Sequence, residues 1–252
     1  MTTINSDETW NILGKENPYY GVLTQEKYLT RNLNEEHLKD FFATGVDYVD
    51  NLFEIIHKHF DQSFNPQTIL DFGCGTGRLL IPFAKRCKKT VGIDISEDIL
   101  AIAKQNAINN HLHNIELYLS DDKLTNISNH KFDLINSYIV FQHINVSRGK
   151  KIMQLLLKLL NTNGICSFHL TYYKDIAKHS KMVDFFRIRI PFLHNFLNLI
   201  DHKPFKMPLL QMNSYDLNFI FRIIQESGVA HGYIAYTKHG NDLGVQLVFQ
   251  KK

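Results

Sequence analysis

The sequence lacks the features that mark secreted or membrane proteins. Its three cysteines, Cys74, Cys87 and Cys166, are too few and too scattered for a disulfide framework or a zinc site. No apolar run approaches the roughly 18 residues that a transmembrane helix needs. The first ten residues, MTTINSDETW, have no apolar stretch of the kind found in signal peptides. We therefore expect a cytoplasmic protein with free thiols and no transmembrane segment.

The chain also lacks a strong charge imbalance. Its formal net charge is +3 over 252 residues, so the chain as a whole does not have the strongly basic character typical of nucleic-acid-binding proteins. The hydrophobic fraction of 44% is ordinary for a globular protein, and the length is sufficient for a full core. These values suit one domain with an addition, or two small domains.

A metal-ligand pattern is missing as well. The thirteen histidines include two close pairs, His57 with His59 and His111 with His113. Side chains two positions apart on a helix point in different directions, and no carboxylate accompanies either pair in a recognisable ligand pattern. We therefore expect no metal site.

What the sequence does contain is a regular alternation of strand and helix patterns. This alternation argues for a parallel sheet with helices on both faces. The last two strand patterns have no helix between them, so one of them is expected to be antiparallel. The expected strands cover residues 68–72, 90–95, 115–119, 132–140, 164–171, 229–236 and 243–249, and the expected helices cover residues 41–60, 78–86, 97–110, 149–160 and 215–226.

Two segments lie outside this alternation. Residues 1–62 are expected to form an N-terminal helical lid segment, preceding a domain at 63–252. Residues 174–213 are rich in apolar side chains and carry seven Lys and Arg against three Asp, and a structureless loop of that length would be unusual. We interpret residues 174–213 as an inserted helical cap. Three functions stay open for it besides simple packing: covering an acidic acceptor, forming a homodimer interface, or making peripheral contact with an anionic membrane.

A glycine-rich turn follows the first strand, in the stretch ILDFGCGTGRLL. Gly73, Gly75 and Gly77 form a G-x-G-x-G pattern, one residue shorter than the dinucleotide fingerprint. Glycines at such a turn allow positive φ angles and let a ligand approach the backbone. Asp71 lies two residues before the first glycine, where a carboxylate disfavours a phosphate and favours a cation.

Acidic residues follow the next two strands. Asp94 ends the second strand, at the position where nucleotide-binding α/β folds bind a ribose diol. Asp121 or Asp122, after the third strand, can accept a hydrogen bond from an adenine amino group. Three consecutive strand ends thus carry acids on one edge of the expected sheet.

The successive motifs ILDFGCGTGRLL, VGIDIS and FDLINSYIVFQHI closely resemble those of class I S-adenosylmethionine (SAM) methyltransferases. The resemblance covers about residues 66–172 and implies a Rossmann-like sheet of seven strands, mostly parallel, with a final antiparallel hairpin. It also implies SAM as cofactor, with Asp71 near the methionine part and Asp94 at the ribose. The turn NTNG departs from the proline-glycine turn of many members. The residues expected at the cofactor are Asp71, Gly73, Cys74, Gly75, Gly77, Asp94, Ile95, Asp121, Asp122, Tyr138 and Tyr20.

The acceptor is less well defined. We expect methyl transfer to an oxygen or nitrogen of a small molecule, with acidic, sugar-linked and lipid-linked metabolites all open. The alternative is a non-catalytic SAM-binding partner or regulatory protein. DNA is not expected, because NSYI lacks the prolines of the motif that amino-DNA methyltransferases have at this position, and no cysteine follows a proline.

His143 is the first candidate for a general base, since an imidazole titrates near neutral pH and this residue follows the fourth strand. The alternative is that His143 packs under the cofactor or bonds a backbone group. Gln142 and Tyr138 are candidates for orienting the acceptor. Tyr19 and Tyr20 either stack near the sulfonium by cation–π attraction or anchor a surface helix. Weaker candidates for the base are His169, His239 and Tyr172.

Overall fold

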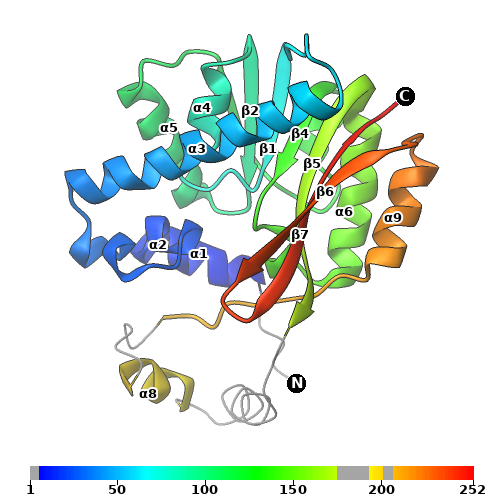
Figure 1. The fold of residues 1–252 in the computed structure, drawn as a ribbon. Coiled ribbons are helices and arrows are strands. Elements are labelled where there is room, and N and C mark those ends of the chain that lie inside the picture. Colours follow the sequence, from blue (N-terminus) through cyan, green and yellow to red (C-terminus); the bar gives the residue numbers. More distant parts are fainter. Residues whose placement is uncertain (1–5, 175–192, 201–206) are drawn as a thin grey trace.

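The structure, a computed structural model, describes residues 6–174, 193–200 and 207–252 (Figure 1). Within them, seven strands form one sheet in the order β3-β2-β1-β4-β5-β7-β6. The pairs among β1 to β5 are parallel, and β7 is antiparallel to both β5 and β6. This is the expected Rossmann-like sheet with its final antiparallel hairpin. The strands are β1 (Thr68–Phe72), β2 (Lys89–Asp94), β3 (Ile115–Leu119), β4 (Phe132–Ser137), β5 (Leu160–Lys174), β6 (Gly232–His239) and β7 (Asp242–Gln250).

Helices cover both faces of the sheet, with α3, α4 and α5 on one side and α6 and α9 on the other (Figure 1). The described helices are α1 (Ser6–Glu16), α2 (Pro18–Val22), α3 (Glu35–His59), α4 (Leu80–Ala84), α5 (Glu97–Asn109), α6 (Val146–Leu159), α8 (Leu193–Ile200) and α9 (Leu217–Glu226). Short 3-10 turns are η1 (Glu26–Tyr28), η2 (Thr30–Asn32), η3 (Thr125–Ile127) and η4 (Phe141–His143).

The alternation of side chains along β1 separates two apolar cores. Leu70 belongs to a cluster that includes residues of α6 and α9, whereas Ile69 belongs to a second cluster with residues of α3 and α4. Successive side chains of a strand point to opposite faces, so both faces of β1 are buried. Such a strand needs apolar residues on both faces, which Ile69 and Leu70 supply.

Two boundaries differ from the sequence-based expectation for local reasons. Strand β4 ends at Ser137 instead of residue 140, because Ile139 has a φ of 61°, outside the extended region. Helix α4 spans only Leu80–Ala84, because the glycine turn occupies the residues before it and Pro82 cannot donate an intrahelical hydrogen bond.

Capping residues extend two other helices toward their N-termini. Asn34 accepts a hydrogen bond from the His37 amide and starts α3 six residues before the expected position. Asn145 accepts from the Ser147 amide and starts α6. Asparagine is a preferred residue at this position, because its side-chain oxygen satisfies a backbone donor that the helix leaves free.

The N-terminal residues form two short helices that lie against α5. The ring of Tyr19 in α2 reaches α5, where its hydroxyl and Asn106 exchange hydrogen bonds. Gly14 in α1 is equally close, because a Cβ at that position would lie 2.4 Å from Ser96 Oγ. Helix α1 therefore lies against the start of α5, whereas Tyr19 of α2 reaches its last turn.

Of the expected insert at 174–213, the structure describes Lys174, α8 and residues 207–213. The other six basic residues of this segment lie outside the described residues, so its role as a basic cap stays a prediction. None of the helices in residues 6–174, 193–200 and 207–252 combines the length and the apolar character needed to cross a bilayer.

Gly45 gives a test of how α3 is packed. Helix propensity alone would make Gly45→Ala stabilising by about 1 kcal/mol. However, a Cβ at this position would lie 2.1 Å from the Arg78 carbonyl oxygen, which belongs to the backbone of the glycine turn. We expect Gly45→Ala to lower the free energy of unfolding by about 1–3 kcal/mol in urea titration.

The matched control is Ala43→Gly at an exposed position of the same helix. It should lose only about 1 kcal/mol, through propensity. A stabilised Gly45→Ala protein would contradict the close packing of α3 on the turn.

Candidate active site

A cavity of about 700 Å³ lies at the carboxyl ends of β1, β2 and β4. Its floor is the glycine turn, and its other walls come from α1, the end of α2 and the residues after it, η4, residues 210 and 212, and the β6–β7 hairpin. Ligands of open α/β sheets bind in this crevice outside the carboxyl ends of the strands. The volume falls in the range of about 300–1,000 Å³ found for small-molecule and cofactor sites.

The glycine turn has the backbone that only glycine adopts easily. The φ angles of Gly73, Gly75 and Gly77 are 73°, 54° and 92°. A Cβ at Gly73 would lie 2.4 Å from a Val140 methyl group, and one at Gly75 would lie 2.6 Å from a Val22 methyl group. Gly73 and Gly75 line the cavity, whereas Gly77 lies outside the lining. Because the first two glycines have no side chains, the segments that carry Val140 and Val22 can pack against the turn.

Asp94 is joined to this turn by hydrogen bonds. The Gly75 amide donates to Asp94 Oδ2 at 2.9 Å, and the Ser96 amide donates to Oδ1 at 3.2 Å. Burial raises the pKa of the Asp94 carboxyl, and these backbone donors oppose the increase. The two bonds fix the orientation of a carboxylate that lines the cavity and retains further acceptor capacity.

Asp71 lines the same cavity at the end of β1. Its Oδ1 accepts from Asn136 Nδ2 at 2.8 Å, and Asn136 Oδ1 accepts from the Tyr48 hydroxyl at 2.8 Å. Burial raises the pKa of Asp71 to about 7, although Asn136 and the Arg78 guanidinium lower it. Asp71 therefore has an environment in which a cationic ligand would favour its charged form.

The contacts of His143 determine its tautomer. Thr171 Oγ1 donates to Gln142 Oε1, which turns the amide nitrogen of Gln142 toward His143 Nε2 at 3.2 Å. His143 Nδ1 lies 2.8 Å from the Gln211 carbonyl oxygen, which can only accept. Nδ1 therefore carries the hydrogen and Nε2 is an acceptor.

His143 is consequently a neutral imidazole beside the cavity. Burial lowers its pKa to about 4, so at neutral pH it is a weak base. Its backbone bond to Gln211 is one of the contacts that the alternative interpretation foresaw. The ring of Trp10 from α1 packs against it, with ring centroids 5.2 Å apart. Its role as general base is a proposal. It requires an acceptor to displace Gln142, whose amide donates to the Nε2 lone pair.

Of the remaining expected cofactor residues, Cys74, Ile95 and Tyr138 also line the cavity. Burial raises the pKa of the Cys74 thiol well above its ordinary value, so the thiol stays protonated at neutral pH. The ring of Tyr138 lies against that of Tyr48, with centroids 4.2 Å apart.

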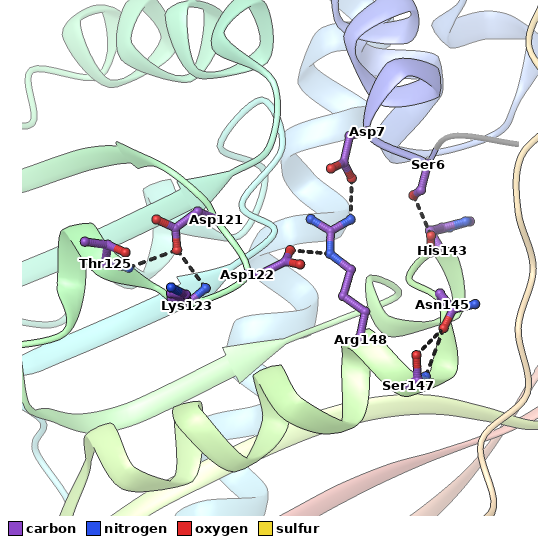
Figure 2. A network of polar contacts seen from close by, with 10 residues as sticks. All are labelled: Ser6, Asp7, Asp121, Asp122, Lys123, Thr125, His143, Asn145, Ser147 and Arg148. Carbon is purple, nitrogen blue, oxygen red and sulfur yellow. Dashed lines mark hydrogen bonds and ion pairs between the residues drawn. The ribbon is translucent and has the colours of Figure 1, made fainter. Parts of the chain in front are cut away.

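Besides Gly77, three expected cofactor residues lie outside the cavity lining. Asp121 accepts from the amides of Lys123 and Thr125 in its own turn, and Tyr20 is buried in the small core beneath α1 and α2. Asp122 pairs with Arg148 (Figure 2). In their place the structure puts Ser120, directly after β3, in the lining.

Arg148 is a residue that sequence reasoning missed. It lies in the first turn of α6 and bridges two acids, with Nη1 2.5 Å from Asp7 of α1 and Nε 2.5 Å from Asp122 (Figure 2). Ser6 adds a hydrogen bond from its hydroxyl to the His143 carbonyl oxygen at 2.7 Å. These contacts join the start of α1 to the far wall of the cavity. No local pattern could reveal them, because Asp7 and Arg148 are 141 residues apart.

Residues 69–164 match the family model described as "Methyltransferase domain". This match spans the glycine turn, Asp94 and η4, which are the parts of the chain that form the floor and one wall of the cavity. Over these residues the chain is similar to a methyltransferase domain. The sheet order and the final hairpin of the methyltransferase domain agree with this assignment.

Curated relatives match only part of the chain. A probable ribosomal RNA small subunit methyltransferase A of Methanosphaera stadtmanae is 36% identical over 120 residues, which is 46% of this chain and 40% of the relative. A 23S rRNA (uracil(1939)-C(5))-methyltransferase RlmD of Aliivibrio fischeri is 32% identical over 103 residues, 41% of this chain and 22% of the relative. The chain spans less than half the length of these relatives.

Solved structures match the methyltransferase domain together with its additions. Magnesium protoporphyrin IX methyltransferase (ChlM) from Synechocystis PCC 6803, with bound S-adenosylhomocysteine (SAH), has a TM-score of 0.65 at 15% identity and covers 98% of both chains. An O-methyltransferase family protein from Burkholderia thailandensis has a TM-score of 0.53 at 12% identity, covering 97% of this chain and 70% of that one. At these identities the likeness shows a shared fold.

Asp71 gives the site a testable pH dependence. Its pKa is about 7 in the folded protein and 3.8 in the unfolded chain, so the folded state keeps a proton that the unfolded state releases between these values. Wild-type stability should therefore lose a contribution as the pH rises from 4 to 7. The side chain of Asp71→Asn cannot ionise. We therefore expect the free energy of unfolding of this variant, relative to wild type, to increase between pH 4 and pH 7 by at most about 1.4 kcal/mol per pH unit. Above pH 7 the difference should level off.

Urea titrations at several pH values measure this difference. Asp133→Asn is the matched control, because Asp133 is also a hydrogen-bonded acid on the sheet but its pKa is lowered by Asn161, Thr68 and Gln67 against the opposing effect of burial. That variant should lose stability at neutral pH. A pH-independent difference for Asp71→Asn would show that the Asp71 carboxyl is already ionised in the folded protein.

Proposed function

We propose that this protein is a SAM-dependent methyltransferase that transfers a methyl group to an oxygen or nitrogen of a small-molecule acceptor. The observation that carries the proposal is the cavity itself, in which the glycine turn and the fixed carboxylate of Asp94 lie beneath the helices α1 and α2. The glycine turn and Asp94 suit the cofactor, and the helices α1 and α2 above them restrict the size of an acceptor that can reach it.

The residues present fit the cofactor. Gly73 and Gly75 line the cavity and have positive φ angles, so the turn presents backbone without side chains to a ligand. Asp94 offers a hydrogen-bonded carboxylate for a ribose diol, and Asp71 offers a buried carboxylate for a cationic group. When bound, SAM supplies a methyl group that is already activated for displacement. The protein then has to align the acceptor and exclude water.

The walls of the cavity favour a small acceptor. Trp10 of α1 and Val22 of α2 line it on one side, and Leu210 and Met212 line it on another. A largely apolar cavity of this kind suits a compact molecule better than a polynucleotide, which needs an extended and basic surface. The solved methyltransferase with magnesium protoporphyrin IX in its name shares this fold over nearly its whole length, additions included.

An RNA acceptor is the second candidate, favoured by the names of the curated relatives. The similarity to those relatives covers 46% and 41% of this chain, and the matched family model ends at residue 164. The residues after 164 include Leu210, Met212 and the β6–β7 hairpin, which line the cavity. The match to the family model therefore does not include the cavity walls after residue 164, which we expect to contact the acceptor.

His143 is the proposed general base within this scheme. Its Nε2 lone pair accepts from Gln142, and an acceptor hydroxyl that displaced Gln142 would donate to the same lone pair. With a pKa of about 4, the imidazole can take a proton only as methyl transfer proceeds, so alignment would supply most of the acceleration. The expected homodimer and cytoplasmic location stay predictions.

We further propose that residues 1–62 act as a lid through α1 and α2. Arg148 ties the start of α1 to the loop after β3, and these ion pairs are half-exposed, so they can open at small free-energy cost (Figure 2). Trp10 lines the cavity from the same helix. Opening of these ion pairs would therefore let α1 move away from the cavity and widen the way to the glycine turn.

Isothermal titration calorimetry with SAH tests the cofactor site. We expect wild type to bind and Asp94→Ala to bind about 10- to 100-fold more weakly, because a hydrogen bond to a charged acceptor contributes about 1.5–3 kcal/mol. Asp98→Ala is the matched control, since Asp98 is exposed and lies four residues further along, in the first turn of α5. If wild type does not bind SAH, the cofactor assignment fails.

The acceptor class is tested with SAM carrying a labelled methyl group. The protein is incubated with a small-metabolite extract and, separately, with total RNA. Label in the metabolite fraction supports the proposal, and label in RNA supports the second candidate. Binding of SAH with label in neither fraction would favour the alternative of a non-catalytic SAM-binding protein.

The lid proposal predicts a change in ligand release. Arg148→Gln removes the charge that pairs with Asp7 and Asp122, and we expect SAH to dissociate about 2- to 10-fold faster at low salt. Salt should speed release from wild type and have less effect on the variant. The fluorescence of Trp10, the only tryptophan, reports release in stopped-flow mixing.

Arg86→Gln is the control, because its ion pair with Asp50 lies away from the cavity. Equal rates of SAH dissociation from wild type, Arg148→Gln and Arg86→Gln would show that the ion pairs of Arg148 do not hold the lid.

A further inference from the structure

Three aromatic side chains meet where the β6–β7 hairpin borders the cavity. Tyr138 follows β4 and His239 ends β6, and both line the cavity, with ring centroids 6.5 Å apart. His169 of β5 lies outside the lining and is 1% exposed. Its ring centroid lies 5.0 Å from that of Tyr138 and 5.2 Å from that of His239. All three pairs meet edge to face, an arrangement that aromatic rings favour, and we call the three residues the aromatic wall.

The sheet order separates the aromatic wall from the acid expected at the cofactor. Asp94 ends β2, whereas the wall comes from β5, β6 and the end of β4. In the sheet, β5 is three strands away from β2, which at about 4.8 Å per strand is roughly 14 Å. Phe168 pairs with Ser137, so His169 lies level with Tyr138. A cofactor held at Asp94 and the glycine turn would therefore leave the hairpin side of the cavity for the acceptor.

The two lining residues of the wall have polar atoms that the protein does not use. No described residue forms a hydrogen bond with the Tyr138 hydroxyl or with a ring nitrogen of His239. His169 differs, because its Nε2 lies 2.8 Å from Thr237 Oγ1, which fixes its ring between the other two. The wall thus combines a buried ring that is held in place with two cavity-facing rings that can bond a ligand.

Both cavity-facing groups are uncharged at neutral pH. Burial raises the pKa of the Tyr138 hydroxyl, although the Arg78 guanidinium lowers it. Burial lowers the pKa of His239, although Asp242 raises it. A phenol hydroxyl and a neutral imidazole can each donate and accept a hydrogen bond. A ligand hydroxyl can donate to one of them and accept from the other, whereas a carboxylate only accepts and an ammonium group only donates.

We infer that the hairpin side of the cavity is the acceptor subsite and binds a planar aromatic molecule that carries a hydroxyl group. Tyr138 and His239 are its specificity-determining residues. This inference rests on the proposed methyltransferase function and names the class of acceptor within it. The rings of the wall favour an aromatic partner, and their free polar atoms favour a hydroxyl. The Arg78 guanidinium, 5.8 Å from the centre of the Tyr138 ring, disfavours an ammonium group there.

The test uses three probes of similar size: 2-naphthol, naphthalene and decahydro-2-naphthol. Naphthalene lacks the hydroxyl, and decahydro-2-naphthol lacks the aromatic rings. Dissociation constants are measured by equilibrium dialysis with the full chain saturated with SAH. We expect 2-naphthol to bind about 3- to 10-fold more tightly than either of the other two, because only 2-naphthol makes both kinds of contact.

Tyr138→Phe and His239→Phe each keep a ring and remove the polar atoms. Each should weaken binding of 2-naphthol about 3- to 10-fold and change binding of naphthalene by less than about 2-fold. The matched controls are Tyr233→Phe and His231→Phe, at or beside β6 but outside the lining of this cavity. They should bind all three probes as wild type does.

The affinity for SAH separates an acceptor role of His239 from a cofactor role. His239→Phe should bind SAH within about 2-fold of wild type, because the hairpin lies on the far side of the sheet order from Asp94. A large loss of SAH affinity in this variant would assign the wall to the cofactor and overturn the inference.

Three further results would overturn the inference while the proposed function stands. In the first, SAH-saturated wild type binds none of the probes. In the second, it binds all three equally. In the third, Tyr138→Phe and His239→Phe both bind 2-naphthol as wild type does. If wild type does not bind SAH, the proposed function fails first and the inference fails with it.

Discussion

The hydrogen bond from the Gly75 amide to the Asp94 carboxylate is the contact on which the site depends. It joins the turn after β1 to the end of β2 and thereby sets the distance between the backbone floor and the acid beside it. The bond can form because Gly73 and Gly75 have positive φ angles, and because neither carries a Cβ that would push Val140 or Val22 away. One backbone conformation thus fixes both the acid and the packing of two neighbouring segments.

The same turn explains why the N-terminal helices can cover the cavity. Val22 packs where a Cβ of Gly75 would lie, so the end of α2 rests directly on the cofactor turn. The start of α1 is held by half-exposed polar contacts to Asp122, Arg148 and His143. The covering segment is therefore packed tightly at one end and held by weaker ion pairs at the other. That difference suits a segment that has to open at one end and stay anchored at the other.

Two buried charged side chains of the cavity have no ion-pair partner among the described residues. Asp71 and Arg78 are both almost completely buried and both lack a partner of opposite charge within bonding distance. Asp94, in contrast, receives two backbone donors. The first pair is stabilised only partly by the protein, whereas Asp94 is organised before any ligand arrives. Buried charges of the first kind reduce stability, and ligand binding is the natural compensation.

Sequence patterns predicted most elements, because each depends on short-range rules, as the strand patterns of β1 and β2 and the glycine turn do. The errors at the end of β4 and in α4 also have local causes, Ile139 with its positive φ and Pro82 after a long turn. Acids at strand ends were harder to interpret. Whether such an acid faces the cavity or its own turn depends on backbone direction, and Asp121 turned out to bond its own loop.

The sequence by itself determined the sheet, the cofactor turn and the position of Asp94, since each follows from the strand, turn and helix preferences of a short stretch of the chain. Only the tertiary structure decided the rest. It brought α1 across to Arg148, 141 residues away, and enclosed the Arg78 guanidinium next to Asp71. It also gave His143 a single tautomer through Gln142 and Gln211. These features depend on contacts between side chains that are far apart in the sequence, and local sequence patterns do not predict such contacts.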